Sequence, residues 1–448
     1  MKKYTLGFIT GILIALTALV ATDAFAFSIS RWRDVISGSW YEAAVNDLGD
    51  IGVVSGYPDG TFKPSNKVTR AEAAQMLEKM KQYVDARVEG KLIPKVSSSI
   101  PVASESNPQN TLLVSASNNS CSALTTPKNY NEVVVSNIDE LTTAIALANS
   151  TGNVVITIKN GTYILSKDLW ISGDNIMIRS QSGKRDDVIL KGQGMRGVVA
   201  SVFHLMGDND VVENVTVGWV ANHPIQIHGE LDADNPVIHN VRFVDGYEQL
   251  LKVSYDAAHV EKGSDNGIVE CSLFEYSVGI GPQFYIGGVD AHNAKNWIVR
   301  GNTFKNIRSP DVDLAEHAIH FWSNSQGTLV ENNVIINSDR GIGFGLGDRG
   351  HIGGIIRNNF IYHDANSRGD VGIVLESAPG AQVYGNKIYL ENDYKNAIEY
   401  RFGSTTGVSI HDNISNKAIA SRDGATGIVA NNTTDATRQA FEAELGNF

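Results

Sequence analysis

Residues 287–292, with the sequence GGVDAH, place a carboxylate and an imidazole two positions apart. If this segment is a β-strand, Asp290 and His292 point to the same face, because successive side chains alternate. Imidazole is the commonest general base in proteins, since its ordinary pKa lies near neutrality. Neighbouring segments add Lys252, His320 and Trp322, which are a cation, a second imidazole and a flat aromatic ring. Such a set is suited to removing a proton that lies beside a negatively charged group.

A loose repeat supplies the scaffold for these groups. Nine heptapeptides of similar pattern begin at residues 211, 237, 268, 298, 329, 355, 382, 409 and 428. Short β-rich units at this spacing, with asparagine at one turn, predict a parallel β-helix. We expect the asparagine amides to stack and to bond from coil to coil, as scaffold rather than as catalytic groups. The fifth position is asparagine in the last six copies, which gives Asn302, Asn333, Asn359, Asn386, Asn413 and Asn432.

A second element of each coil alternates between apolar and polar residues. Its copies begin at residues 225, 251, 287, 319, 342, 373 and 398, an alignment that sets Gly288 opposite Gln226. The apolar positions predict a core. Gly343 and Gly345 fall on the outward side, where missing side chains would open a groove floor. His317 has inward parity and predicts a core or turn histidine. The outward side chains are predicted to be Gln226, His228, Lys252, Ser254, Asp290, His320, Trp322, Val374, Glu376, Glu399 and Arg401.

The repeat resembles that of right-handed parallel β-helix enzymes that act on carbohydrates, namely polysaccharide lyases and mannuronan epimerases. The stretch 288–293, GVDAHN, is similar to the G-x-D-P-H-D stretch of the epimerases, with alanine and asparagine at the two departures. His317 matches a histidine that precedes a strand one coil later. The resemblance implies that Asp290 and His292 are catalytic and that the substrate is a uronate-containing polysaccharide. The predicted fold class is mainly β, a right-handed parallel β-helix with a small α-helical module.

The predicted chemistry is removal of the proton at carbon 5 of a uronate, which is acidified when its carboxylate is neutralised. A lyase then expels the 4-linked sugar, whereas an epimerase returns a proton to the other face. The predicted base is His292 or His320. Lys252 or Arg401 neutralises the carboxylate, and Asp290 orients an imidazole or binds a cation.

Further residues are predicted to bind the substrate. Trp322 offers a platform for a sugar ring, Gln226 and His228 extend the same face, and Arg340 is a second group that can neutralise a uronate. Tyr285 is a predicted substrate contact and, with Tyr255, a reserve proton donor.

The carboxylates on the outward face allow a metal site or a different reaction. Asp290, Glu376 and Glu399 are predicted as ligands of a shared Ca²⁺, which accepts oxygen ligands flexibly. The same three residues would be the candidates in a glycoside hydrolase, which needs two carboxylates ~5–5.5 Å or ~6.5–9.5 Å apart. A third possibility is a protein that binds a polysaccharide or builds a surface structure without catalysis.

The N-terminal part differs in composition from the repeat. Residues 1–26 combine two lysines, an apolar run and Ala24-Phe25-Ala26, which predicts a secretory signal peptide. Residues 27–85 predict two helices around a turn-rich loop, residues 86–125 a flexible linker, and residues 126–448 the β-helix.

Three motifs in the first of these segments resemble the S-layer homology module: WYEAAVNDL, GVVSGYPDGTFKP and VTRAEAAQML. The resemblance implies attachment to a cell-envelope polymer, with Arg70 and Glu72 in the ligand groove. Helix capping is the alternative for these two residues.

Overall composition sets further limits. The 448 residues carry a formal charge of −12, which argues against non-specific nucleic-acid binding. No segment after the signal peptide approaches ~18 apolar residues, so no membrane span is predicted in the mature protein. The two cysteines, Cys121 and Cys271, are far apart in the sequence, and we expect free thiols more than a disulfide, although export permits one.

Overall fold

The computed structural model describes residues 121–445 except Ser367, together with scattered positions between 32 and 81. The chain divides into two units, residues 1–108 and residues 109–448, and each is described by itself. The predicted signal peptide, residues 86–120 of the predicted linker, and Arg70 and Glu72 lie outside the described residues. Within the described part, no helix is both long and apolar enough to cross a membrane.

The first unit has a small apolar core of its own. The Asp34 carboxylate accepts hydrogen bonds from the backbone N–H groups of Phe62 and Lys63, both at 2.7 Å. The N–H of Ala73 donates to the carbonyl of Thr69, as expected for a helix that begins there. The buried side chains of this core are Trp32, Val35, Val45, Val53 and Val54.

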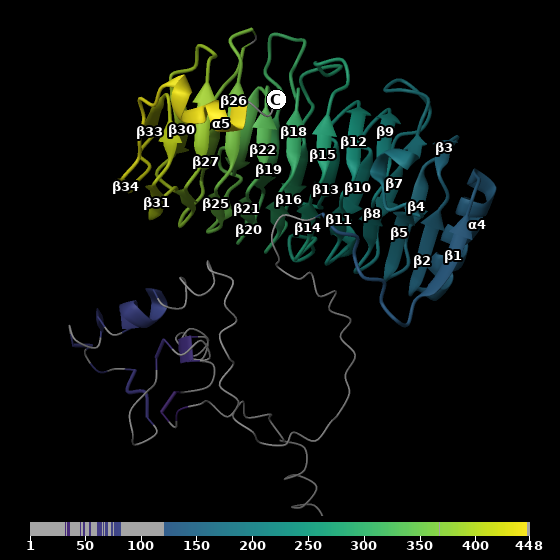
Figure 1. Ribbon diagram of the computed structural model, residues 1–448, viewed down its shortest axis with the longest axis horizontal. Helices are drawn as coiled ribbons and strands as arrows, with labels where there is room; N and C mark the ends of the chain where they lie inside the picture. The colour runs from purple at the N-terminus through teal and green to yellow at the C-terminus, as the bar shows by residue number, and fades with distance from the viewer. Residues whose placement is uncertain are drawn as a thin grey trace, which may run out of the picture. The chain divides into compact units, whose positions relative to one another are not determined.

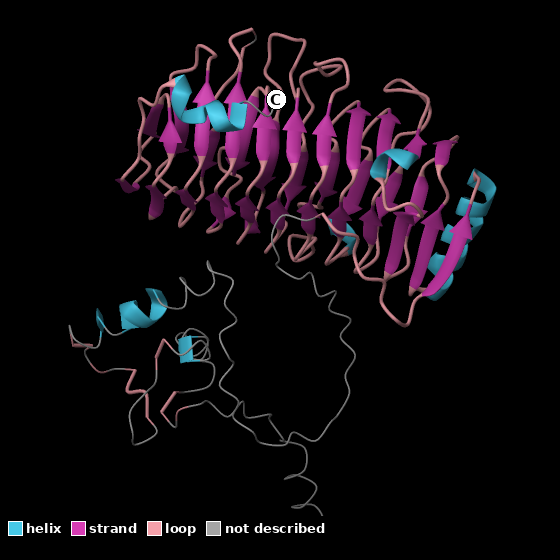
Figure 2. Cartoon of the chain, viewed as in Figure 1, coloured by secondary structure: helices cyan, strands magenta, loops and turns pink. Residues whose placement is uncertain are grey.

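The second unit is a parallel β-solenoid of about 11 turns, which confirms the predicted parallel β-helix. Its strands stack side by side in three sheets, as Figures 1 and 2 show. Each turn passes through the first, second and third sheet in that order, so neighbouring strands of a sheet come from successive turns.

The first sheet contains β1 (Asn131–Val135), β2 (Val154–Ile158), β5 (Ile176–Ser180), β8 (Val211–Glu213), β11 (Val237–His239), β14 (Ile268–Glu270), β17 (Ile298–Arg300), β21 (Leu329–Glu331), β25 (Ile355–Arg357), β28 (Gln382–Tyr384), β31 (Val408–His411) and β34 (Gly427–Ala430). The second contains β3 (Gly161–Ile164), β6 (Val188–Lys191), β9 (Thr216–Val220), β12 (Arg242–Gly246), β15 (Leu273–Glu275), β18 (Thr303–Lys305), β22 (Val334–Ile336), β26 (Phe360–His363), β29 (Lys387–Leu390) and β32 (Ile414–Ser415). The third contains β4 (Leu169–Ile171), β7 (Phe203–Leu205), β10 (Ile225–His228), β13 (Leu251–Ser254), β16 (Val289–His292), β19 (His317–Trp322), β23 (Arg340–Phe344), β27 (Ile373–Glu376), β30 (Asn396–Arg401) and β33 (Ala418–Arg422). Two short strands, β20 (Ser325–Gln326) and β24 (His351–Ile352), pair beside them, and the short 3-10 helices are η1 (Arg185–Asp187), η2 (Gly229–Leu231) and η3 (Arg438–Phe441).

A left-handed residue followed by a buried asparagine makes the turn between the first and second sheets. Asn332 and Asn358 have φ of 55° and 54°, a conformation that asparagine tolerates. The following residues, Asn333 and Asn359, are 1% exposed, and the Nδ2–H of the former donates to Oδ1 of the latter at 3.0 Å. The same bond repeats in every step from Asn302 to Asn432. The predicted asparagine ladder is therefore confirmed, and it pairs polar groups that the stack buries.

Apolar side chains fill the interior in rows. The rings of Phe243, Phe274 and Phe304 stack with centroids 4.3 and 4.6 Å apart. The inward row of the third sheet is fully buried, as the alternation predicts, and contains Ile225, Leu251, Val289, Ile319, Ile342, Ile373 and Ile398.

Helices cover parts of the stack near its two ends. Helix α4 (Ile138–Thr151) lies against β1, β2 and β4, and buries one apolar face there. Helix α5 (Glu442–Leu445) follows η3, whose Phe441 is fully buried beside Tyr389 of β29, with ring centroids 4.9 Å apart.

The chain enters the solenoid by crossing the outer face of the first sheet. Leu124 and Tyr130 of this entry segment pack on outward apolar residues of β2, β5, β8 and β11. Cys121 forms a disulfide with Cys271 in the turn after β14, with Cα atoms 5.7 Å apart. The expectation of free thiols is therefore wrong, because the folded chain brings together two residues that are 150 positions apart.

Candidate functional site

The outer face of the third sheet carries the predicted groups on adjacent strands. Lys252 of β13 pairs with Asp290 of β16, and Asp290 pairs with His320 of β19. Two residues further along, His292 pairs with Trp322. The prediction that these five side chains share one face is confirmed.

The register differs from the predicted alignment in one respect. Gln226 lies opposite Lys252 and therefore in the row of Asp290, whereas the alignment set Gln226 opposite Gly288. The error is a shift of two residues, which leaves every side chain on its face because the alternation has a period of two.

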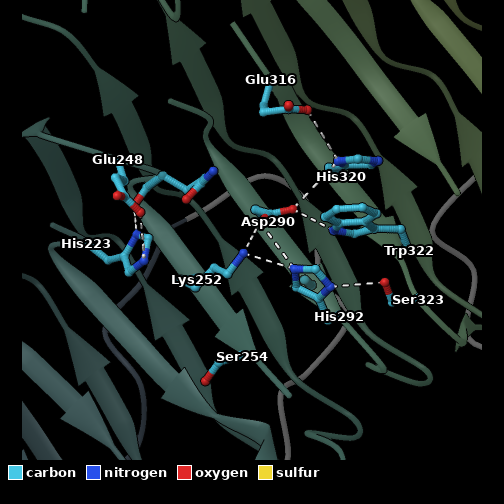
Figure 3. Close-up of polar contacts among 12 residues, drawn as sticks. His223, Glu248, Lys252, Ser254, Asp290, His292, Glu316, His320, Trp322 and Ser323 are labelled. Atoms are coloured by element: carbon cyan, nitrogen blue, oxygen red, sulfur yellow. Dashed lines mark hydrogen bonds and ion pairs between the residues drawn. The ribbon is translucent and has the colours of Figure 1, made fainter. Parts of the chain in front are cut away.

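Asp290 is the centre of the cluster and is 2% exposed. Its Oδ1 accepts the indole N–H of Trp322 at 2.8 Å, and its Oδ2 accepts a hydrogen bond from the Lys252 ammonium (Figure 3). Nitrogens of His292 and His320 lie 3.7 and 3.6 Å from the carboxylate oxygens. Burial alone would raise the pKa of Asp290, but the charge and the hydrogen bond of the Lys252 ammonium lower it below its usual value. Asp290 is therefore an anion.

His292 is a neutral imidazole with a defined tautomer. The Nζ of Lys252 lies 3.0 Å from its Nε2, and an ammonium only donates, so Nε2 accepts. Nδ1 then carries the hydrogen and donates to the Ser323 hydroxyl at 3.1 Å. The Tyr255 ring stacks on the imidazole, with centroids 5.0 Å apart. Burial lowers the pKa of His292 to about 3, although the negative charge of Asp290 acts to raise it. The imidazole is therefore in its base form at neutral pH.

Lys252 is the cation of the cluster, and its side chain is 12% exposed. Burial works to lower its pKa, but the charge and hydrogen bond of Asp290 raise the pKa above its usual value. Among the described residues its ammonium bonds to Asp290 and His292. One of its three N–H groups is then left for a ligand.

Other side chains cover both faces of the Trp322 ring. Its side chain is 7% exposed, the His320 ring stacks on it with centroids 4.8 Å apart, and the Arg349 guanidinium lies 4.0 Å from its centroid. The predicted role as a sugar platform is therefore wrong. The indole N–H instead fixes the orientation of Asp290.

His317 turns to the outer side of the sheet, so its predicted inward position is wrong. It begins β19, and its ring centroid lies 4.4 Å from that of His320. Gly343 of β23 makes room for this ring, because a Cβ there would lie 2.8 Å from its Nε2. The predicted open groove floor is wrong too: His317 fills the space over Gly343, and a Cβ on Gly345 would meet the Glu376 carbonyl oxygen at 1.7 Å.

Three predicted residues lie too far along the stack to join the cluster. Glu376 of β27 is three strands from β16, and Glu399 and Arg401 of β30 are four strands from it, ~19 Å at ~4.8 Å per strand. Arg401 pairs with Glu376, and Arg422 pairs with Glu399, both at 2.9 Å. A Ca²⁺ shared with Asp290 is therefore wrong, since Ca²⁺ ligands lie ~2.3–2.6 Å from the ion. At this distance Arg401 cannot neutralise a substrate carboxylate bound at Asp290. Neither Glu376 nor Glu399 can form with Asp290 the carboxylate pair that a glycoside hydrolase needs.

Other predicted contacts surround the cluster. Gln226 donates to the Ser254 hydroxyl at 3.2 Å, and Tyr285 is 39% exposed in the segment before β16. Arg340 pairs with Asp370 at 3.3 Å. Their roles in binding remain proposals.

A second series of titratable groups continues the face toward β4. His204 of β7 contacts Asp168 at 3.2 Å and His228 at 3.0 Å. His228 in turn contacts Glu230 at 2.7 Å. Trp170 is 48% exposed, stacks on His204 at 3.8 Å and lines a hollow of about 500 Å³. The sequence pattern placed His228 on this face but missed Asp168, Trp170 and His204, although LWI and FHL show the same alternation as the later coils.

Comparisons of sequence show which family the first unit is similar to. Residues 33–74 match the S-layer homology domain, so the chain contains this domain. The outer membrane protein SlpA of Thermus thermophilus is 31% identical over 85 residues, which are 19% of this chain and 8% of the relative. S-layer protein EA1 of Bacillus anthracis is 35% identical over 80 residues, 18% of this chain and 9% of the relative. The chain thus matches less than a tenth of the length of these relatives. The domain and these relatives support a location at the cell envelope or cell surface.

Comparisons of structure concern the solenoid. An alginate lyase from Paenibacillus sp. str. FPU-7 superposes with a TM-score of 0.50 at 18% identity, over 66% of this chain and 99% of the lyase. A mannuronic acid specific polysaccharide family 6 lyase from human gut microbiota gives a TM-score of 0.47 at 16% identity, over 67% and 79% of the two chains. The likeness to the alginate lyase, at 18% identity, shows a common β-solenoid fold and nothing more.

Proposed function

We propose that the protein is a cell-surface enzyme that removes the proton at carbon 5 of a uronate in a polysaccharide. The observation that carries this proposal is the cluster of Lys252, Asp290 and His292 on the outer face of the third sheet. It holds a neutral base, an ammonium and a carboxylate in mutual contact. Titratable groups whose surroundings push their pKa values apart are the usual basis of acid–base catalysis.

In the proposed reaction the substrate carboxylate accepts a hydrogen bond from Lys252, and this neutralisation acidifies the proton at carbon 5. As the ammonium turns to the substrate, Nε2 of His292 is released and takes that proton. In a lyase the electron pair forms the C4–C5 double bond while the C4–O bond breaks; in an epimerase carbon 5 is protonated on the other face. Tyr255, stacked on His292, and the half-exposed Tyr285 are the proposed proton donors. Asp290 stabilises the imidazolium.

His292, rather than His320, is the proposed base. His320 is 1% exposed, and its Nε2–H donates to the Gly345 carbonyl at 3.1 Å. Its other nitrogen faces the Asp290 carboxylate at 3.6 Å. His320 therefore offers no exposed nitrogen that a sugar could approach.

The test uses polymannuronate, polyguluronate and polygalacturonate in D₂O. Ultraviolet absorbance from an unsaturated uronate indicates a lyase, and deuterium at carbon 5 without absorbance, seen by NMR, indicates an epimerase. His292→Ala should lower the rate by ~10²-fold or more. The matched control is His259→Ala, whose side chain is 60% exposed in a loop. Neither signal on any polymer, or an unchanged rate in His292→Ala, contradicts the proposal.

We also propose that the S-layer homology domain attaches the enzyme to an envelope polymer, with Arg70 and Glu72 as contacts. Deleting residues 31–83 should release the protein from isolated envelopes. The melting temperature of the solenoid should not change, because the two units have separate cores. Equal envelope binding by the shortened protein would remove this role.

A further inference from the structure

Two imidazoles and a carboxylate converge where β19 begins. Oε2 of Glu316 lies 4.0 Å from Nδ1 of His317 and 4.0 Å from Nδ1 of His320. One ligand atom from each residue lies within 4.8 Å of the others. His317 is 4% exposed, and within the described chain neither of its ring nitrogens has a hydrogen-bond partner. An unpaired buried polar group destabilises the fold, so the arrangement calls for a ligand.

His320 directs a lone pair at two carboxylates. Its Nε2 lies 3.1 Å from the Gly345 carbonyl, which only accepts, so the hydrogen is on Nε2. In the neutral ring Nδ1 is then a bare lone pair, 3.6 Å from Asp290 and 4.0 Å from Glu316. A lone pair facing two anions is repulsive unless a positive charge lies between them. Histidines that bind metals characteristically donate their other N–H to such a carbonyl.

Gly343 keeps the site open on the side of the next strand. A Cβ at this position would lie 2.8–3.0 Å from three atoms of the His317 ring. The glycine therefore permits the ring to lie beside His320 on the outer side of the sheet. Any larger residue would push the ring away.

We propose that Glu316, His317 and His320 bind a divalent transition-metal ion, of which Zn²⁺ is the best match. Two imidazole nitrogens and one carboxylate oxygen form a known type of zinc site with an open fourth position, whereas Ca²⁺ takes oxygen ligands. Bonds of ~2.0–2.2 Å in a tetrahedron place ligand atoms ~3.3 Å apart. The two 4.0 Å separations from Glu316 therefore need to shorten by about 0.7 Å, and the two imidazole nitrogens lie within 4.8 Å of each other. Binding thus requires rotation of the partly exposed Glu316 side chain and of a histidine ring.

This site does not depend on the proposed reaction, because metal binding is measured without a substrate. Where both hold, the ion lies one strand from Asp290 and offers a second positive charge to a uronate carboxylate. Loss of metal binding would leave the roles of Lys252 and His292 untouched.

The experiment uses the full chain after treatment with a chelator. Calorimetry with Zn²⁺ and visible absorbance with Co²⁺ should show one ion per chain. Glu316→Gln and His317→Ala should each weaken binding by at least the ~10–100-fold typical of changes around a metal site. Gly343→Ala should weaken it too, by displacing the His317 ring without removing a ligand. His259→Ala, an exposed histidine elsewhere, should bind as the wild type does.

Circular dichroism establishes that each variant is folded. If His317→Ala does not fold, Glu316→Gln serves as the test variant, because Glu316 is partly exposed just before β19. No Zn²⁺ binding by the wild type up to millimolar concentration overturns the proposal. Unchanged affinity in folded Glu316→Gln overturns it as well, and identifies an adventitious ion only.

Discussion

The ion pair between Lys252 and Asp290 offers the sharpest test of the cluster. Both side chains are buried, at 12% and 3% exposure, and the pair is the main contact of the ammonium. Asp290→Asn keeps the shape and can still accept the Trp322 N–H, so it removes the charge alone. Lys252 is then a buried cation without its partner, which costs ~3–5 kcal/mol of stability. Lys252→Met should cost a similar amount, because it isolates the Asp290 anion.

The double variant distinguishes this explanation from simple damage to the sheet. Because neither charge is then unpaired, its cost should fall short of the sum of the single costs by about 1–3 kcal/mol. Urea unfolding followed by circular dichroism gives the three values, and hydrogen exchange of β13, β16 and β19 shows whether the opening is local. The control is the more exposed pair of Lys295 and Asp265, 3.6 Å apart, for which we expect a coupling of about 0–1 kcal/mol. Additive costs for Lys252 and Asp290 would refute the reasoning.

Three further outcomes are expected. Asn333→Ala interrupts the asparagine ladder and should lower the free energy of unfolding by ~1–3 kcal/mol, with turnover per folded molecule unchanged; a large loss of turnover would show a catalytic role. His223 and His351 are buried, and burial lowers their pKa values to about 4 and about 3. The unfolded chain therefore binds more protons below about pH 6.5, so stability should fall as the pH drops from there, by about 1–2 kcal/mol per histidine by about pH 5; urea midpoints should be flatter with pH in His223→Gln. Reducing the disulfide of Cys121 and Cys271 should raise hydrogen exchange in residues 121–130 and leave β16 and β19 protected; equal exchange before and after reduction would mean that packing alone holds the segment.

Alternation along the strands was sufficient to place Asp290, His320 and Trp322 on one face. The rule is geometric, and it holds even where the alignment of a coil was shifted by two residues. Alternation does not show how far apart two residues lie along the stack. Glu399 and Arg401 have the correct parity, but they lie four strands from Asp290, a separation that follows from the number of repeat copies between them at ~4.8 Å per strand.

Side-chain surroundings were the other source of error. His317 stands at the first residue of β19, where its ring turns into the space over Gly343 instead of following the alternation. Trp322 looked like an open platform because the residue that covers it, Arg349, comes from a separate loop. The sequence could not show either contact, since both join residues from different turns of the solenoid.

The disulfide at Cys271 decides where tension on the chain enters the solenoid. Residues before 121 lead to the unit with the S-layer homology domain, so drag on the solenoid of an attached molecule passes through this connection. Without the bond, tension would reach β1 first and peel off strands one after another, because each turn contacts only its neighbours. With the bond, tension enters after β14, the sixth of 12 strands in the first sheet, and must shear several turns together. The disulfide thereby makes the solenoid more resistant to tension applied through its N-terminal connection.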